Sequence, residues 1–393
     1  MYSIAQINRS EVPAERPRRV GPGRIRGLLG AVLVALPLAV PAADLRLPAG
    51  FRIEVVAEGL TDARSLARAP DGTLFVGTRR EGVVYAVQDR DGDGHYEART
   101  LLDRGLVMPN GVAWLDGDLY VAEMQRIWRY PDVLRHLHAP KRELVTDALP
   151  AEKHHGWRYL RFDSAGRLYV SIGAPCNVCE ASAFGPGEAF RTASIIRMER
   201  DGSNWETVAT GVRNSVGLFV DADDRLWFTD NGRDWLGDDL PPGELNRADR
   251  SAADYGFPYC HGGRVPDPDF DDRPCESFVS PLQALGPHVA PLGLLVYGGG
   301  SFPADYRGDV LIAEHGSWNR SEKIGYRITR VRIDEGKAVG YEPMVTGWLR
   351  GEQVSGRPVD LLQLPDGSVL ISDDHGGRIW RLHYTGSTDD PRR

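Results

Sequence analysis

The chain has 393 residues and a formal net charge of −8, and its basic residues are scattered along its length. A nucleic-acid-binding surface needs clustered cations, so nucleic acid is excluded as the expected partner. The 45 glycines and 27 prolines, with few stretches of helical period, instead favour an all-β protein.

The N-terminal segment is typical of a secretory signal peptide. Basic residues up to Arg26 precede an apolar run at 27–40, and the small residues Ala42 and Ala43 follow it. We therefore predict a signal peptide over 1–42, with translation starting at Met1 or downstream, for instance at Val20. The apolar run is too short to span a bilayer, which needs about 20 residues. The mature protein is expected to be periplasmic or secreted, without a transmembrane segment.

A strand-turn-strand pattern then recurs six times. Each copy has a Gly or Asp turn followed by a short alternating strand, and the copies begin at Ala69, Leu115, Asp163, Asp221, Tyr306 and Leu364. Radial repetition hides strand edges that an open sheet would expose. The sequence therefore predicts a six-bladed β-propeller over 43–385. We also expect a long loop insertion over about 234–291 and a disordered tail over 386–393.

An acidic run lies in the first copy. Asp89, Asp91 and Asp93 alternate before Gly94, as oxygen ligands do at the front of a calcium loop, but Thr100 stands where the bidentate Glu belongs. The run indicates either a structural calcium site or an acidic hairpin tip without metal.

Polar side chains follow a strand in most of the copies, and strand ends of a propeller meet around one channel. They include Glu123, Asp230, Asn231, Glu314, His315, Asp373, Asp374 and His375. His154 and His155 precede the third copy; on a strand they would point to opposite faces, so only one would reach the channel as a base. Arg213 and Asn214 suit the clamping of a carboxylate. A purely structural role stays open for each of these pairs.

Four cysteines in an exported chain favour two local disulfides, Cys176–Cys179 and Cys260–Cys275. A zinc site built from the four thiols is the less favoured alternative. The CNVC run is followed by Glu180 instead of His, which does not support covalent haem attachment.

These motifs together resemble the soluble glucose/sorbosone dehydrogenases that use pyrroloquinoline quinone (PQQ). The resemblance rests on HHGWRYLRFDSAGRLYVSIGAPCNVC, GVRNSVGLF with TDNG, HVAPLGLLVYGG with FPADYRGDVLIAEHGSWNR, and RPVDLLQLPDGSVLISDD. CNVC and HGSWNR are typical of the sorbosone branch. The resemblance covers essentially the whole mature chain and implies a six-bladed propeller with PQQ and Ca²⁺ as cofactors.

The resemblance also implies roles for individual residues. Counting back from the strand at 168–173 makes His155 the catalytic base, which takes the proton of the sugar hydroxyl while a hydride passes to the quinone. The implied cofactor contacts are Arg213, Asn214, Asn231, Arg357, Asn110, His288 and His154, and the implied calcium ligands are the backbone carbonyls of Gly232 and Arg233. A second cofactor arginine of the family is replaced here by Val359. The lysine that the family has in the fifth repeat is displaced in this chain, which leaves Arg320 or Lys323 as substitutes.

We accordingly expect a PQQ-dependent dehydrogenase that oxidises an aldose or sugar aldehyde to a lactone or acid. Its electrons would pass to a separate acceptor, a cytochrome or a quinone. One alternative is a calcium-dependent lactonase in which Glu123, Asp230, Asp373 and Asp374 surround one ion. The other is a non-catalytic binding propeller whose cofactor site has decayed.

Overall fold

The computed structural model describes residues 45–249 and 252–386, which belong to one compact unit, Ala39–Arg393. The predicted signal peptide lies outside the described residues, as does the predicted tail from residue 387 onward. The described part of the chain contains no α-helix and no helix that could cross a membrane. Its helical turns are η2 (Val133–Arg135), η3 (Pro186–Glu188), η4 (Cys275–Ser277) and η5 (Ala304–Tyr306).

Six sheets form the six predicted blades, each with four antiparallel strands in chain order, except that β1 completes the last blade. The first three blades are β2 (Ala63–Arg68), β3 (Leu74–Thr78), β4 (Val83–Gln88), β5 (Ala98–Arg104); β6 (Gly111–Leu115), β7 (Asp118–Ala122), β8 (Ile127–Tyr130), β9 (Glu143–Thr146); and β10 (Leu160–Phe162), β11 (Leu168–Ile172), β14 (Ser194–Met198), β15 (Glu206–Thr210). The last three are β16 (Leu218–Val220), β17 (Leu226–Asp230), β18 (Pro242–Ala248), β22 (Gln283–Pro287); β23 (Pro291–Val296), β24 (Val310–Glu314), β25 (Arg327–Asp334), β26 (Lys337–Val345); and β29 (Pro358–Gln363), β30 (Val369–Asp373), β31 (Arg378–Tyr384), β1 (Phe51–Ala57).

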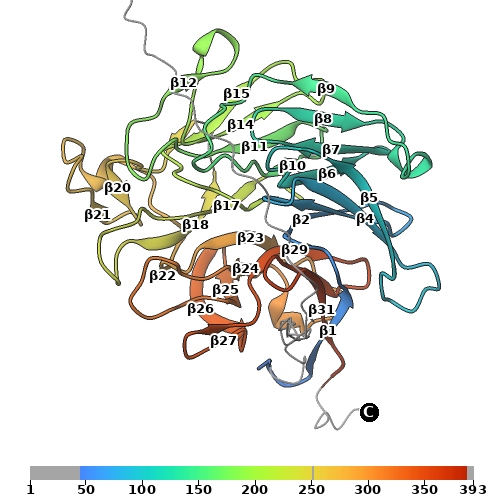
Figure 1. The fold of residues 1–393 in the computed structure, drawn as a ribbon. Coiled ribbons are helices and arrows are strands. Elements are labelled where there is room, and N and C mark those ends of the chain that lie inside the picture. The colour runs from blue at the N-terminus through green and yellow to red at the C-terminus, as the bar shows by residue number, and fades with distance from the viewer. Residues whose placement is uncertain (1–44, 250–251, 387–393) are drawn as a thin grey trace, which may run out of the picture. The chain divides into compact units, whose positions relative to one another are not determined.

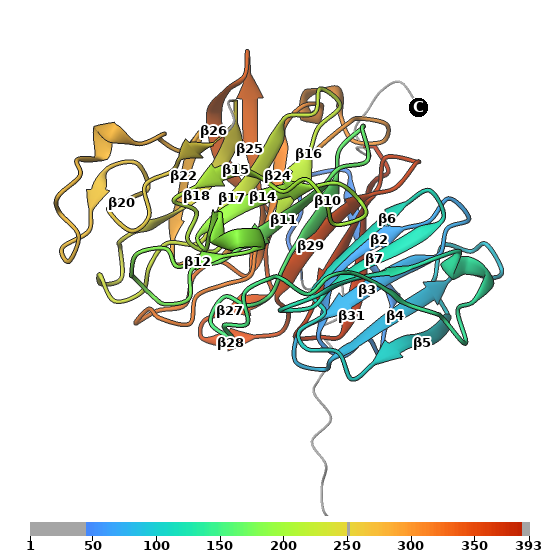
Figure 2. The same cartoon turned by 90° about the horizontal axis from the view of Figure 1, so that it is seen from above.

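The blades close into a ring, as Figures 1 and 2 show. The first strand of each blade contacts the first strand of the next, in the order β2, β6, β10, β16, β23, β29 and back to β2. The ring is fastened by its ends, because β1 pairs with β31 and completes the last blade. The predicted six-bladed propeller is confirmed.

The sixfold repeat in the sequence marks the second strand of each blade. These strands are β3, β7, β11, β17, β24 and β30, and nearly every residue in them is buried. Each is covered on both faces because a propeller blade packs between two neighbours. The six largest hydrophobic clusters of the described residues are accordingly each shared by two adjacent blades.

The predicted single loop over 234–291 is wrong in its extent, because β18 and β22 of the fourth blade lie inside it. Strand β18 has no apolar alternation that would have indicated it. Its buried polar residues, Glu244 and Asn246, bond to each other, and Glu244 also accepts the Gly262 N–H. Between these two strands lie β19 (Ala253–Asp254), which pairs parallel with β15, and the hairpin β20 (Cys260–His261) and β21 (Val265–Pro266).

Two further hairpins lie outside the blades. They are β12 (Ala183–Phe184) with β13 (Phe190–Arg191), and β27 (Leu349–Arg350) with β28 (Gln353–Val354).

Candidate active-site cavity

A cavity of about 650 Å³ lies where the first strands of the blades begin and the second strands end. Arg64, at the start of β2, and Arg357, just before β29, represent the first strands. Arg79, Asn231 and His315 each follow directly after a second strand. Adjacent strands of a blade are antiparallel, so the start of a first strand and the end of a second strand lie on the same face of the propeller. The predicted convergence of strand ends is therefore confirmed for Asn231 and His315.

The cavity wall is cationic although the chain as a whole is acidic. Its lining contains the basic side chains Arg64, Arg79, Arg80, Lys153, Arg213 and Arg357, with Asp234 as the one lining carboxylate. Four histidines lie beside them: His154, His155, His288 and His315. Concentrated positive charge at a concave, partly desolvated surface favours an anionic ligand.

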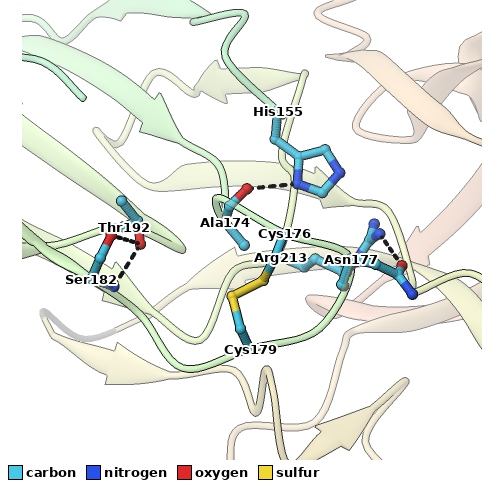
Figure 3. The surroundings of a disulfide bond; sticks show 8 residues. All are labelled: His155, Ala174, Cys176, Asn177, Cys179, Ser182, Thr192 and Arg213. Carbon is cyan, nitrogen blue, oxygen red and sulfur yellow. Dashed lines mark hydrogen bonds between the residues drawn. A yellow bond between two sulfur atoms is a disulfide. The ribbon is translucent and has the colours of Figure 1, made fainter. Parts of the chain in front are cut away.

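His155 is a buried side chain in this wall. Its Nδ1 lies 2.9 Å from the carbonyl oxygen of Ala174, as Figure 3 shows. A carbonyl can only accept, so Nδ1 carries the proton and Nε2 keeps its lone pair. Burial, Arg213 and His154 hold the pKa of His155 well below its ordinary 6.5. The ring is therefore a neutral proton acceptor at pH 7.

Two contacts fix the backbone of His155, which has a left-handed φ of 50°. The fully buried Arg158 donates to its carbonyl oxygen at 3.2 Å, and to the carbonyls of Met124 and Pro150. Gly173 packs so closely that a Cβ there would lie 2.4 Å from the Cβ of His155. The base is thus positioned by a buried guanidinium and by a glycine at the end of β11.

The predicted placement of the two histidines on a strand is wrong, because both lie in a turn before β10. Their rings meet edge to face with centroids 4.1 Å apart. The turn buries His155 and exposes His154, although both line the cavity. The left-handed turn, and not the alternation of a strand, therefore puts one histidine in a buried environment and the other in an exposed one.

Arg213 lines the cavity but also holds its wall together. The guanidinium donates to the Asn177 carbonyl at 2.8 Å, to the Asn177 Oδ1 at 2.8 Å and to the Asn231 carbonyl at 3.1 Å, and it pairs with Asp234 at 3.4 Å. Most of its donors are therefore bound to protein. The predicted carboxylate clamp would need a guanidinium fork whose N–H groups are free for a ligand, and Arg213 differs from that.

Asp230 organises the backbone beneath Arg213. Its carboxylate accepts the N–H groups of Arg213, Asn214 and Asn231 at 2.7, 2.6 and 2.9 Å. Burial and the neighbouring Glu244 raise the pKa of Asp230 to about 8, and burial raises that of Glu244 too. Two neighbouring buried carboxyls disfavour each other's charged form, and the Asp230 oxygens are already satisfied by the three backbone N–H groups.

Asp374 joins three cationic or basic groups on the opposite part of the wall. Arg64, Arg357 and His315 contact its carboxylate at 2.9, 2.9 and 3.0 Å. Burial raises the pKa of this carboxyl, but the three partners outweigh burial and hold it far below its usual range. Asp374 therefore stays ionised and anchors Arg64 and Arg357 at the cavity.

The other residues predicted to bind the cofactor divide into two groups. Asn214, Asn231, Gly232, His288 and Arg357 line the cavity.

Asn110 and Arg233 lie outside the lining. Asn110 is fully buried, where it accepts from Arg64 at 3.0 Å and so orients that arginine. The side chain of Arg233 turns away to pair with Asp267 and Asp269. Of the suggested lysine substitutes, Arg320 binds Asp238 and Asp239, and Lys323 binds Glu352; neither lines the cavity.

Both predicted disulfides, Cys176–Cys179 and Cys260–Cys275, are present, and the zinc alternative is excluded because no cysteine in the chain is free. The first closes the loop that carries Asn177, the partner of Arg213, as Figure 3 shows. The second lies in the insertion of the fourth blade.

The acidic run at 89–94 forms a hairpin tip between β4 and β5. Asp89, Asp91 and Glu97 gather there with carboxylate oxygens within 4.8 Å of one another. Asp93 lies outside this group and accepts the His95 N–H instead. This is the one group of three such ligands found in residues 45–249 and 252–386, so the carboxylates of the lactonase hypothesis do not gather around a common point.

Sequence reasoning missed several residues that shape the cavity. Arg64, Arg79 and Lys153 contribute to its charge, and Arg158 and Asn177 position His155 and Arg213. A signal for Arg79 was present, because it follows a second strand as Asn231 and His315 do. No local pattern marks Arg158, whose partners are backbone carbonyls of a folded loop.

Fold and cavity together define a class: a six-bladed β-propeller with a cationic cavity at one end of its channel. A family model described as TrAA12-like matches residues 45–269 and 264–385. The chain belongs to the TrAA12-like family. A relative from Borreliella burgdorferi, described as an uncharacterized protein, is 32% identical over 366 residues, which are 86% of this chain and 91% of that protein.

Solved structures share the fold at lower identity. The holo PQQ domain of pyranose dehydrogenase from Coprinopsis cinerea has a TM-score of 0.70 and 19% identity, over 86% of this chain and 97% of that one. A calcium structure of the Trichoderma reesei AA12 enzyme has a TM-score of 0.70 and 20% identity, over 89% and 99%. The PQQ-bound aldose sugar dehydrogenase of Streptomyces coelicolor gives 0.58 and 21%, over 86% and 99%.

Proposed function

We propose that this protein is a PQQ-dependent oxidoreductase that oxidises an aldose or sugar aldehyde, glucose-like or sorbosone-like, to a lactone or acid. The observation that carries the proposal is the cavity itself: six basic side chains and a buried, neutral histidine face one space in an acidic chain. Solved structures with the same fold are described as PQQ-containing pyranose and aldose dehydrogenases, which supports this substrate class.

The donors in the cavity suit the three carboxylates of PQQ. Arg79 stacks on Trp157 at 3.9 Å, and its guanidinium pairs with no carboxylate among the described residues. Arg357 contacts Asp374 through Nε, which leaves its terminal nitrogens for a ligand. Guanidinium N–H groups that have no protein acceptor in a partly desolvated wall are stabilised by an anion that accepts from them. The cavity therefore fits a planar polyanion.

In this proposal Arg79 and Arg357 would hold the carboxylates of PQQ, and Asn231 and the backbone carbonyl of Gly232 would hold calcium from the cavity lining, which Arg233 does not join. When bound, the calcium-linked quinone supplies the acceptor for two electrons from the sugar. His155 accepts the proton of the sugar hydroxyl at Nε2, since Nδ1 is already bonded to Ala174. The proton and the two electrons of the substrate are thus transferred to different acceptors.

The finer assignments also belong to the proposal. The CNVC and HGSWNR motifs favour a substrate preference like that of the sorbosone branch. The predicted signal peptide and the two disulfides favour a periplasmic or secreted protein. Electrons are passed to a separate cytochrome or quinone. The triad of Asp89, Asp91 and Glu97 is a candidate second, structural calcium site.

Quinone binding tests this proposal at Arg79. The variant Arg79→Gln should weaken PQQ binding by about tenfold or more, because a charge-assisted contact to a carboxylate is lost. Its thermal unfolding should change little, since Arg79 makes no ion pair that holds the fold. Arg104→Gln, an exposed arginine on β5 outside the cavity lining, is the matched control. Equal PQQ affinity in all three proteins would contradict a cofactor site in this cavity.

A dye-reduction assay separates the dehydrogenase from the two alternatives. Sugar should reduce an artificial electron acceptor only after both PQQ and calcium are added. Hydrolysis of lactones with metal alone would favour the lactonase. Failure to bind PQQ under any reconstitution would favour the binding propeller.

A further inference from the structure

Two exposed tryptophans form a pair at the rim of the cavity. Trp235 is 67% exposed and Trp318 is 70% exposed, and these are the two most exposed large apolar side chains of the described residues. Their rings meet edge to face, with centroids 5.5 Å apart at 88°. Trp318 lines the cavity, as does Asp234, the neighbour of Trp235. An aromatic pair that stays in water at the mouth of a binding site has a function other than packing.

The two loops that carry the tryptophans are bonded to each other. Arg320 donates to the Asp238 carbonyl at 3.1 Å and to the Asp239 carboxylate at 3.2 Å. The Ser321 N–H donates to the Asp238 carboxylate at 2.9 Å. A pair held by such contacts keeps its geometry before any ligand arrives, which lowers the entropic cost of binding.

The backbone of Trp235 supports the same interpretation. Its φ is +71°, a left-handed conformation that a bulky residue rarely adopts. The strain turns a large indole toward solvent, where it buries little surface. Backbone strain that brings no packing gain is a feature of ligand sites.

Two unpaired donors lie in the cavity lining, and one of them belongs to the residue that follows Trp318. The Nε1 of Trp157 and the Nδ2 of Asn319 are buried without a hydrogen-bond partner, and both residues line the cavity. A buried donor is normally paired, so each of these needs an acceptor from a ligand or solvent. Hydroxyl oxygens of a sugar are acceptors of this kind.

We propose that Trp235 and Trp318 form an outer sugar-binding subsite, and that the substrate is therefore an oligosaccharide or glycan end instead of a single sugar. The inference rests on the proposed sugar dehydrogenase function and extends it. The C–H face of a pyranose ring packs against an indole, and the unpaired donors hold hydroxyl groups of the adjoining ring. One sugar is then bound at the rim while the next unit enters the cavity toward His155.

The test compares saccharides of different length on the reconstituted full chain. The ratio of kcat/KM for cellotetraose or maltotetraose to that for glucose should fall by at least about fivefold in the variant Trp235→Ala/Trp318→Ala, because the apolar surface that the outer sugar ring packs on is lost. Trp235→Phe/Trp318→Phe should recover part of the ratio. Leu144→Ala, an exposed apolar residue on β9, is the control and should leave the ratio unchanged. An unchanged ratio in the double alanine variant overturns the subsite.

A second measurement keeps this proposal separate from the dehydrogenase proposal. Tetrasaccharides with a reduced, non-oxidisable end are titrated against the protein without cofactor, and tryptophan fluorescence is recorded. Wild type should bind at least one of the two, and the double alanine variant should bind more weakly. Equal binding, or none by wild type, overturns the subsite whatever the redox activity. Slower electron transfer to a protein acceptor with unchanged saccharide binding overturns it as well, and assigns the pair to acceptor docking.

Discussion

Three contacts of His155 decide how this side chain can act. The Ala174 carbonyl fixes the tautomer, Arg158 fixes the backbone, and Gly173 allows the close approach. These contacts come from Arg158 in the same loop and from Gly173 and Ala174 after β11, so the role cannot be copied to His154, which lies one residue away and is exposed. The role of each histidine is therefore set by the groups that surround its imidazole ring.

Replacement of the two histidines tests this assignment. His155→Ala should lose at least about 10²-fold in turnover while the PQQ-bound absorption spectrum is kept, because a positioned base accelerates the proton transfer by roughly 10²–10⁴-fold. His154→Ala should keep measurable turnover and weaken the affinity for PQQ or sugar. An inactive His154→Ala variant beside an active His155→Ala variant would assign the base to the other ring.

The protonation of His155 gives a second prediction at this scale. The folded protein holds its pKa below 6.5, whereas the unfolded chain takes up a proton near that value. Below pH 6.5 the unfolded state then binds more protons, so the free energy of unfolding falls as the pH is lowered. The loss between pH 7 and pH 5 should be smaller in His155→Gln than in wild type, as measured by denaturant unfolding. A His155 ring that titrates above 6.5 by NMR would contradict the expectation.

Residue identities could be predicted from the sequence where a motif fixes the spacing, and only there. His155 and Arg213 were placed at the cavity in this way. Asn110 was also predicted at the cavity from its motif, but it lies buried under Arg64 outside the lining, a position that depends on contacts between the first and second blades. Arg213 and Arg357 were predicted, but Arg64, Arg79 and Arg80 were missed because only the closed ring brings them to the same cavity.

At the scale of elements, the end of β11 and the turn before β10 act as one unit. The variant Gly173→Ala should lower turnover by roughly 10–100-fold, since a Cβ 2.4 Å from that of His155 displaces the ring. PQQ binding should persist. Gly298→Ala is the control, because its nearest neighbour would lie at 3.4 Å and it is remote from the cavity lining. Equal turnover of Gly173→Ala and wild type would show that the ring is not held this way.

The disulfide loop at Cys176–Cys179 gives the second prediction for an element. The variant Cys176→Ser/Cys179→Ser frees the loop that carries Asn177, the partner of Arg213. Affinity for PQQ should fall about two- to tenfold, because binding then has to order the loop. The matched variant Cys260→Ser/Cys275→Ser alters the insertion of the fourth blade, outside the cavity lining. PQQ affinities reduced equally in both variants would point to a general loss of stability.

For the whole molecule, the number of blades could be predicted because each second strand is buried on both faces and keeps a readable apolar run. The fourth blade was only half recognised, since β18 carries buried polar residues that are paired through contacts absent from any local pattern. No local sequence pattern predicts that β1 closes the ring, because its partner β31 lies at the other end of the chain.

The central claim is that this propeller uses PQQ to oxidise a sugar. The most direct measurement is the absorption spectrum of the purified protein, reconstituted with PQQ and calcium, before and after an aldose is added without any electron acceptor. The account predicts that the bound quinone changes from its oxidised to its reduced spectrum in wild type, and about 10²-fold more slowly or not at all in His155→Ala. An unchanged oxidised spectrum in wild type with glucose, sorbosone and their oligosaccharide counterparts would contradict it.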